Sequence, residues 1–315
     1  MTSLSLGRRS IFNAVVTLNR KKAERFYKLK LEFSGSGAEA LKNFKPGQFA
    51  QLDLSTAALP SQEKIPQDLS DESGRLILLR RPFSFIDVTV LKDKTTAELL
   101  YSVVGPATLR MTGLAAGDSL SVIGPLGNGF SAPQGKKTTL MVAGGMGAPP
   151  LLHLAKILSA EHPDMEAIVF AGAKTVKDLP FENRLDKISQ ELGYALSEFA
   201  TYGFTSQVAT DDGSAGHHGP VTNCLSQWMQ ENRPEPRNII IYSCGPEAML
   251  AKVAEIAGGK TIDCQVSMER RMACGFGVCQ SCAVECKVAG SNETIYKLCC
   301  EDGPVFDGKE IIFAV

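Results

Sequence analysis

Short hydrophobic runs broken by glycine, proline and aspartate fill the first 132 residues of the chain. Runs of this length, bounded by turn residues, are typical of β-strands. Many short strands of this kind predict a small antiparallel barrel. The polar stretch 57–74 interrupts them and predicts a surface loop. The expected strands are residues 10–19, 26–33, 49–54, 76–79, 98–104 and 119–123.

After residue 136 the pattern changes to continuous apolar strands that alternate with helical segments. This alternation predicts a parallel, doubly wound sheet. The last segment is short and rich in loops, so we expect a bound cluster to hold it together. Strands are expected at 138–143, 167–172 and 238–243, and helices at 151–160, at 181–192 and from Glu247 onward. The predicted domains are a β-barrel over 1–132, an α/β domain over 133–261 and a small C-terminal domain over 262–315.

Composition and charge narrow the range of functions. The chain has 315 residues and a formal net charge of −1, so nucleic acid is not an expected partner. The first residues contain no long apolar segment, so we expect neither a signal peptide nor a membrane anchor. A thiol-rich composition without a secretion signal fits a reducing compartment, and we expect a cytoplasmic location.

The last predicted domain contains a distinctive group of cysteines. Three of them have the spacing C-x4-C-x2-C around two glycines, and an adjacent pair begins seventeen residues after the third. This is the plant-type ferredoxin spacing for a [2Fe–2S] cluster, in which four thiolates hold two irons. Such a cluster moves one electron at a time. The ligand candidates are Cys274, Cys279 and Cys282, with either Cys299 or Cys300 as the fourth.

Other uses of cysteine are less consistent with this spacing. Structural zinc usually takes two Cys-x2–4-Cys pairs, whereas here a triple is followed by a distant position. A disulfide framework is unusual in a chain of this size with no secretion signal. Free cysteines are often simply buried, but chance seldom places three of them at this spacing around two glycines. The iron–sulfur cluster is therefore favoured.

Two glycine-containing turns follow predicted strands of the α/β domain. Glycines let backbone N–H groups approach a pyrophosphate, and the start of the following helix favours its negative charge. The first turn departs from the G-x-G-x-x-G fingerprint, because Pro150 occupies the third position. Each turn alone is weak evidence, but two together favour nucleotide binding. The candidate residues are Gly144, Gly145, Gly147, Cys244, Gly245 and Pro246.

A third block, Arg80-Arg81-Pro82-Phe83-Ser84, follows an apolar run. An arginine can clamp a diphosphate, and a serine can hydrogen-bond to a ring nitrogen. An arginine pair at the end of a strand can equally be structural, and without further context that simpler interpretation is favoured.

Taken in order, these blocks resemble the ferredoxin–NADP reductase superfamily and, within it, the electron-transfer subunits of class B dihydroorotate dehydrogenases. The resemblance spans nearly the whole chain and is most specific at the cysteine-rich end. It rests on Arg-Pro-Phe-Ser, Gly-Pro-Leu-Gly-Asn-Gly-Phe, Gly-Gly-Met-Gly-Ala-Pro-Pro, Asp-Asp-Gly-Ser, Cys-Gly-Pro-Glu-Ala-Met-Leu, Met-Ala-Cys-Gly-Phe-Gly-Val-Cys and Cys-Glu-Asp-Gly-Pro-Val-Phe.

The resemblance implies an FAD-binding barrel, a nicotinamide-nucleotide domain and a [2Fe–2S] domain. It also implies Cys300 as the fourth cluster ligand. The chain departs from the family at two positions: Ser102 stands where an arginine is frequent, and Ala107 where a glycine is usual. The FAD-binding residues that it implies are Arg81, Pro82, Phe83, Ser84, Leu100, Tyr101, Ser102, Ala107 and Thr108.

The resemblance further implies a function. A partner subunit containing FMN would oxidise dihydroorotate to orotate in pyrimidine biosynthesis, and this chain would pass the electrons through the cluster and FAD to NAD⁺. FAD is the necessary converter, because nicotinamide exchanges hydride and a cluster exchanges single electrons. The family expectation is a heterotetramer of two subunits of each kind. The sequence assigns no catalytic residue and does not separate NAD from NADP.

Two alternatives remain open from the sequence. The first is a related flavin and iron–sulfur subunit of a sulfide dehydrogenase, a bifurcating transhydrogenase or a hydrogenase, with the same parts and a different terminal substrate. The second is a zinc-binding or redox-sensing protein without catalysis. The second would purify colourless, whereas a flavin and cluster protein would be yellow-brown.

Overall fold

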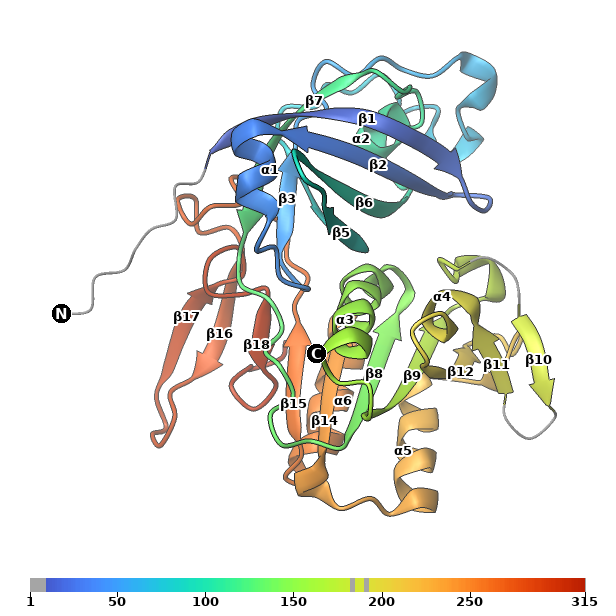
Figure 1. Ribbon diagram of the computed structural model, residues 1–315, viewed down its shortest axis with the longest axis vertical. Coiled ribbons are helices and arrows are strands. Elements are labelled where there is room, and N and C mark those ends of the chain that lie inside the picture. The colour runs from blue at the N-terminus through green and yellow to red at the C-terminus, as the bar shows by residue number, and fades with distance from the viewer. Residues whose placement is uncertain (1–9, 182–184, 190–192, 315) are drawn as a thin grey trace.

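The computed structural model describes residues 10–181, 185–189 and 193–314. Its first part is a curved, seven-stranded antiparallel sheet with strand order β4-β3-β7-β1-β2-β6-β5 (Figure 1). The strands are β1 (Ile11–Lys21), β2 (Phe26–Ser34), β3 (Phe49–Leu52), β4 (Arg81–Ser84), β5 (Asp87–Val90), β6 (Lys94–Ser102) and β7 (Ser119–Leu126), with helices α1 (Gly35–Leu41) and α2 (Pro106–Met111).

Alternating residues of these strands build one core inside the curve of the sheet. Leu29, Leu31 and Phe33 of β2 are fully buried, while the residues between them are partly exposed. This period of two is the pattern of a strand with one buried face. The antiparallel barrel expected from the sequence is confirmed as a half-barrel sheet.

The expected strand at 76–79 is wrong, because the ladder begins at Arg81. Leu76 and Leu78 are 80% and 83% exposed and have no neighbouring strand. A hydrophobic run therefore does not form a strand where no partner satisfies its backbone. The stretch 57–74 is a surface loop, as expected, with Leu69 as its buried residue.

The second part of the chain is a seven-stranded sheet with order β13-β12-β9-β8-β14-β15-β18. All neighbours are parallel except the pair β15–β18. Its strands are β8 (Thr138–Gly144), β9 (Glu166–Ala173), β12 (Thr205–Thr210), β13 (His217–His218), β14 (Ile239–Cys244), β15 (Asp263–Ser267) and β18 (Val305–Asp307). Its helices are α3 (Ala148–Glu161), α4 (Ser197–Ala200), α5 (Val221–Asn232) and α6 (Glu247–Gly258).

The helices cover both faces of this sheet, which is why its central strands read as continuous apolar runs. Leu140 and Val142 pack with residues of α5 and α6, whereas Met141 and Ala143 pack with residues of α3 and α4. The doubly wound α/β arrangement predicted from the sequence is thus confirmed. Short 3₁₀ helices lie at Gln62–Lys64 (η1), Gln67–Leu69 (η2), Gly145–Gly147 (η3), Val176–Asp178 (η4) and Pro236–Asn238 (η5).

The helix expected over 181–192 is not observed. The described part of this stretch contains strand β10 (Leu185–Ser189), which pairs antiparallel with β11 (Gly193–Leu196); residues 182–184 and 190–192 lie outside the described residues. Pairing with β11 satisfies the backbone groups that a helix would have satisfied internally. Pairing with the next strand along the chain has overridden the weak helical preference.

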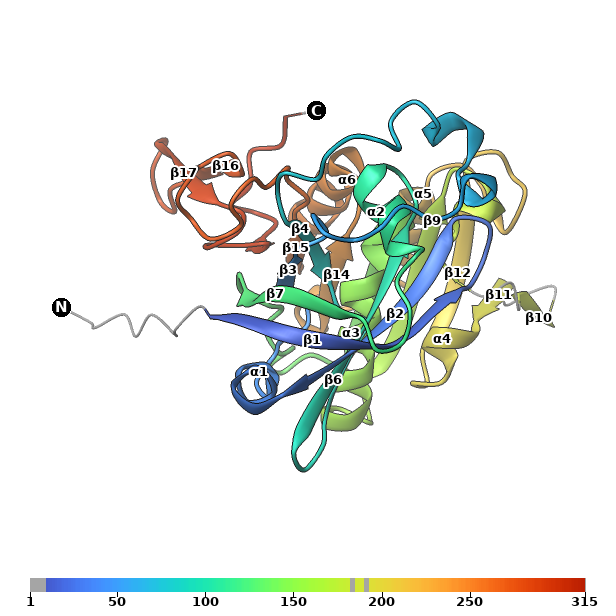
Figure 2. The same ribbon diagram turned by 90° about the horizontal axis from the view of Figure 1, so that it is seen from above.

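The cysteine-rich part forms a small lobe beside the parallel sheet, on the side opposite β10 and β11 (Figure 2). It contains the hairpin β16 (Ala283–Lys287) and β17 (Thr294–Leu298). Val284, Cys286 and Ile311 of the lobe share one core with Val253 of α6 and Val266 of β15. The sheet therefore includes strands from residues 262–315, and the lobe packs on the α/β core. No helix in the described ranges is long and apolar enough to cross a membrane.

A buried histidine lies where the α/β part meets the curved sheet. His153 of α3 is 2% exposed, stacks on Phe44 with ring centroids 5.9 Å apart, and has no hydrogen-bond partner for Nδ1. Lys156, one turn later on α3, forms an ion pair with Asp87 of β5. Burial lowers the pKa of His153 to about 4.

We expect this histidine to make the protein less stable in acid. The unfolded chain takes up the proton near pH 6.5, whereas the folded protein takes it up only near pH 4. The free energy of unfolding should therefore fall by about 3 kcal/mol as the pH drops through this window, and stay level below it. His153→Phe should remove this part of the pH dependence in urea unfolding. Parallel pH profiles for variant and wild type would contradict the assignment.

Candidate functional site

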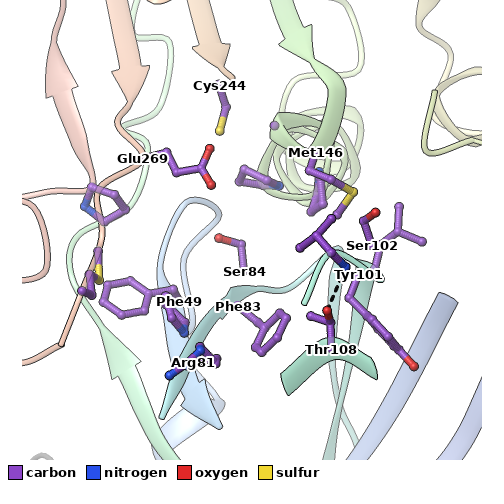
Figure 3. A pocket seen from close by; sticks show the side chains of 18 of the residues that line it. Phe49, Arg81, Phe83, Ser84, Tyr101, Ser102, Thr108, Met146, Cys244 and Glu269 are labelled. Atoms are coloured by element: carbon purple, nitrogen blue, oxygen red, sulfur yellow. Dashed lines mark hydrogen bonds between the residues drawn. The ribbon is translucent and has the colours of Figure 1, made fainter. Parts of the chain in front are cut away.

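A cavity of about 590 Å³ lies where the curved sheet, the parallel sheet and the cysteine-rich lobe meet (Figure 3). This volume is in the range of cofactor and ligand sites, and the lining is mostly apolar with a few polar groups, as such sites require. The sequence-predicted FAD-binding residues all line it: Arg81, Pro82, Phe83, Ser84, Leu100, Tyr101, Ser102, Ala107 and Thr108.

The arginine pair divides into a structural and a cavity residue. Arg80 donates hydrogen bonds to the backbone oxygen and the hydroxyl of Ser121, at 2.8 and 2.9 Å, and lies 3.2 Å from a carboxylate oxygen of Asp53. Arg81 lines the cavity and is held by the carbonyl of Leu79 at 2.7 Å. The structural interpretation of the pair from the sequence therefore describes Arg80, and Arg81 is the member that reaches the cavity.

Two of the predicted residues use their hydroxyl groups locally. Thr108 Oγ1 accepts hydrogen bonds from the backbone N–H groups of Val104 and Gly105, at 3.0 and 3.2 Å (Figure 3). Tyr101 donates its hydroxyl to Asn19 Oδ1 at 3.1 Å. These residues shape the cavity wall, and their side-chain oxygens are already occupied.

Three polar side chains from different elements face one another across the cavity. Ser84 comes from β4, Cys244 from the end of β14, and Glu269 from the segment after β15 (Figure 3). Burial raises the pKa of Cys244 to about 12, so it is a neutral thiol at pH 7. Polar groups that converge in an apolar cavity fix the orientation of a ligand.

The two glycine-containing turns meet at the point where the parallel sheet reverses its strand order. β8 connects through α3 to β9 on one side, while β14 lies on its other side. Ligands of open α/β sheets bind at the carboxyl ends of such strands. A Cβ atom on Gly147 would lie 2.0 Å from the carbonyl oxygen of Cys244, so the approach of the turns requires glycine there. Gly147 and Cys244 line the cavity, whereas Gly144, Gly145, Gly245 and Pro246 are absent from its lining.

Sequence reasoning missed the segment that closes the cavity from the lobe side. Met268, Glu269 and Arg270 all line it. Arg270 forms a two-pronged ion pair with Glu247, both distances being 2.8 Å, which ties this segment to the start of α6. The signal was available as Met-Glu-Arg-Arg directly before the cysteine loop, but nothing in the sequence places it beside β4.

The four predicted cluster ligands come together as two pairs. The backbone N–H of Cys279 donates to Cys274 Sγ at 3.4 Å, and the two side chains are also hydrogen-bonded. Cys300 is hydrogen-bonded to Cys282, and its Sγ accepts the backbone N–H of Gly277 at 3.2 Å. Hydrogen bonds from Ser281 and from Cys274 lower the pKa of the exposed Cys279 to about 6.

Cys299 lies apart from this group. Its fully buried thiol donates to the carbonyl oxygen of Met268 at 3.3 Å, toward the cavity wall. Burial raises the pKa of Cys299. Throughout residues 10–181, 185–189 and 193–314, no group of three or more His, Cys, Asp or Glu side chains is arranged to hold a single metal ion.

The fold is of the ferredoxin–NADP reductase type and ends in a small cysteine-rich lobe. The NADH-dependent reduced ferredoxin–NADP oxidoreductase superposes with a TM-score of 0.70 at 24% identity, over 98% of this chain and 92% of that one. Phthalate dioxygenase reductase superposes with a TM-score of 0.56 at 15% identity, over 92% and 96%. These likenesses concern the fold.

The sequence comparisons identify the family. Residues 141–255 match the oxidoreductase NAD-binding domain, and residues 269–312 match the iron–sulfur cluster binding domain of dihydroorotate dehydrogenase B. The chain belongs to the family of dihydroorotate dehydrogenase B (NAD⁺) electron transfer subunits. It is 35% identical to that of Bacillus caldolyticus over 94% of this chain and 96% of the relative, and 33% identical to that of Caldanaerobacter subterraneus over 95% and 98%. The predicted family, fold class and NAD-linked oxidoreductase function are thereby confirmed.

Proposed function

We propose that this chain binds FAD in the cavity and a [2Fe–2S] cluster on its four paired cysteines. It would carry electrons from an FMN-containing dihydroorotate dehydrogenase subunit through the cluster and FAD to NAD⁺, in pyrimidine (UMP) biosynthesis. The observation that carries the proposal is that the cysteine loop and the cavity share one wall. Cys299, next to Cys300 in the chain, is hydrogen-bonded at 3.3 Å to Met268, which lines the cavity.

The pairing of the cysteines supports a cluster with two irons. A [2Fe–2S] cluster held by four thiolates places two of them on each iron. The contacts group Cys274 with Cys279, and Cys282 with Cys300. Backbone N–H groups already point at two of these sulfurs, as expected for thiolates that carry negative charge. Cys300 is the fourth ligand in this proposal, because its neighbour is turned to the cavity wall.

The cavity fits a flavin nucleotide. Apolar and aromatic residues dominate its wall, Arg81 supplies a positive charge for a diphosphate, and Ser84 supplies a hydroxyl group. When bound, FAD converts between the hydride of nicotinamide and the single electrons of a cluster. Ser84, Cys244 and Glu269 surround the region where the two glycine-containing turns face β4. They are therefore the residues expected to orient the flavin ring and the nicotinamide ring.

The relative position of lobe and curved sheet is fixed by hydrogen bonds. Asn128, just after β7, donates to the carbonyl oxygen of Asp302 at 2.6 Å and accepts from the backbone N–H of Val305 at 3.1 Å. The backbone N–H of Asn128 also donates to Gly303 at 2.6 Å. This clamp holds the segment after Cys300 against the sheet, and a fixed distance is what electron transfer between two bound cofactors needs.

The cluster loop also reaches the surface. Cys279 is exposed, and the neighbouring Val278 is 73% exposed. This exposure leaves the cluster loop accessible to another protein. We place the FMN-containing subunit against this loop, in a heterotetramer of two subunits of each kind.

Co-purification tests this proposal. The chain is isolated from its host, its iron and flavin are measured, and the proteins that accompany it are identified. We expect a yellow-brown complex with a dihydroorotate-oxidising subunit that reduces NAD⁺ when given dihydroorotate. Recovery of a sulfide-oxidising or hydrogenase subunit in its place would overturn the assigned partner, and a colourless chain would overturn the cofactors.

Arg81 provides a sharper test of the flavin site. Arg81→Met should weaken FAD binding by roughly 10- to 100-fold, because a hydrogen bond from a charged group contributes about 1.5–3 kcal/mol. Titration of the flavin-free protein with FAD, followed by fluorescence, measures this loss. Arg80→Met is the matched control, since Arg80 is bonded to Ser121 and Asp53. Weaker FAD binding in the control alone would refute the assigned roles.

A further inference from the structure

Gln51 of β3 is a buried amide without a partner. Its side chain is completely buried, and neither Nε2 nor Oε1 makes a hydrogen bond. A glutamine side chain offers two N–H donors and one acceptor oxygen. Leaving such a buried group unpaired costs about 1–3 kcal/mol, so its position calls for a partner that the protein atoms do not supply.

This amide lies directly against the cluster loop. A Cβ atom on Gly275 would be 2.1 Å from Gln51 Nε2, so the amide packs on the backbone next to Cys274. Gly275 has a φ of +78°, a conformation that favours glycine and lets the loop turn beneath the amide. The side chain nearest to a Cβ at this glycine thus carries an unpaired hydrogen-bond donor.

The strand register explains how the amide reaches the loop. Ala50 and Leu52 belong to the core inside the curved sheet, whereas Phe49 belongs to the core shared with the lobe and also lines the cavity. Gln51 alternates with Ala50 and Leu52, so it points to the same side as Phe49. Its backbone pairs with Pro82 of the cavity wall. Gln51 therefore stands between the flavin-binding wall and the cysteine loop.

We propose that Gln51 donates a hydrogen bond to a sulfur atom of the iron–sulfur cluster, either a bridging sulfide or the Cys274 thiolate, and thereby raises the cluster's reduction potential. This inference rests on the proposed function, because it requires the cluster. A reduced cluster carries one more negative charge than an oxidised one, so a hydrogen bond to its sulfur stabilises the reduced form more. Gln51, a residue of the curved sheet, would then raise the reduction potential of the cluster in the neighbouring lobe.

Redox titration followed by electron paramagnetic resonance tests the proposal on the purified holoprotein. Gln51→Leu and Gln51→Met both remove the donor at similar volume. Each should lower the midpoint potential by roughly 59 mV, which is a tenfold change in the equilibrium constant for one electron. Gln48→Leu is the matched control, because the amide of Gln48 is already bonded to the backbone of Lys45 and Gly127. Its cluster potential should equal that of the wild type.

The outcomes separate this inference from the function on which it rests. Unchanged cluster potentials in both Gln51 variants would overturn it, and so would a shift of the flavin potential alone. A shift in only one of the two variants would indicate altered packing and also count against it. A wild-type protein without iron would instead overturn the proposed function.

A second measurement does not depend on the variants folding. In wild-type protein labelled with ¹⁵N in its glutamine side chains, pulsed electron paramagnetic resonance of the reduced cluster should detect a coupled ¹⁵N nucleus. Failure to detect any glutamine coupling would overturn the hydrogen bond directly.

Discussion

Cys300→Ser is expected to abolish the proposed [2Fe–2S] cluster, while Cys299→Ser leaves it in place. The two residues are adjacent, but their thiols are turned in different directions. Cys300 Sγ accepts the N–H of Gly277 and contacts Cys282, whereas Cys299 Sγ donates to Met268. A cluster that needs four thiolates loses one ligand in the first variant and none in the second.

Iron content per flavin and the broad visible absorption of the cluster measure this difference. We expect Cys300→Ser to retain the flavin and lose at least nine-tenths of the cluster absorption. In Cys299→Ser a hydroxyl group replaces the thiol and can still donate to the Met268 carbonyl, so iron content should match the wild type. Loss of iron only in the Cys299 variant would reverse the assignment of the fourth ligand.

Gly147→Val should reduce NADH oxidation by about 100-fold or more while leaving FAD and iron in place. A side chain at Gly147 meets the Cys244 carbonyl at 2.0 Å, so the two nucleotide turns must move apart. Displacement of a reacting group by about 1 Å can cost roughly 100-fold in rate. The proposed flavin-binding residues lie on β4, β6 and α2, so FAD should stay bound although Gly147 also lines the cavity.

Stopped-flow reduction of the bound flavin by NADH isolates this step from the partner subunit. Gly258→Ala is the matched control, because a Cβ atom at Gly258 meets nothing within 4 Å and the residue lies at the end of α6. Its rate should equal that of the wild type. A Gly147→Val protein that reacts with NADH at the wild-type rate would place the nicotinamide elsewhere.

The fold was predictable where burial of a strand leaves a clear pattern in the sequence. A strand buried on one face alternates between apolar and polar residues, and a strand buried on both faces is a continuous apolar run. β1, β2, β8 and β14 lie close to their expected positions, because their apolar patterns reflect the core directly. The failures at 76–79 and 181–192 share a physical cause. In both, the outcome depends on whether a neighbouring strand is available for pairing: among the described residues no strand stands beside 76–79, whereas β11 follows β10 directly and pairs with it.

The motifs of the candidate site were predictable from the sequence. The residues that other elements contribute to it were not. The cysteine loop expresses its chemistry in its own residues, whereas the Arg-Pro-Phe-Ser block was assigned to the site through the family resemblance. Glu269, Arg270 and Gln51 acquire their roles only when β3, β4 and the lobe come together. Gln51 is part of an ordinary strand pattern, and only its unpaired burial distinguishes it.

The lobe leaves the parallel sheet after β15 and returns to it at β18, where Ser267 and Val305 are paired neighbours. The two ends of the segment between β15 and β18 are therefore held next to each other in the sheet. A foreign insert whose termini lie equally close together could therefore be joined between these two strands, provided that the segment after β18, where Ile311 packs on the lobe, is exchanged with it. Residues 269–312 expressed alone, in contrast, would lack α6 and β15, with which the lobe shares its core.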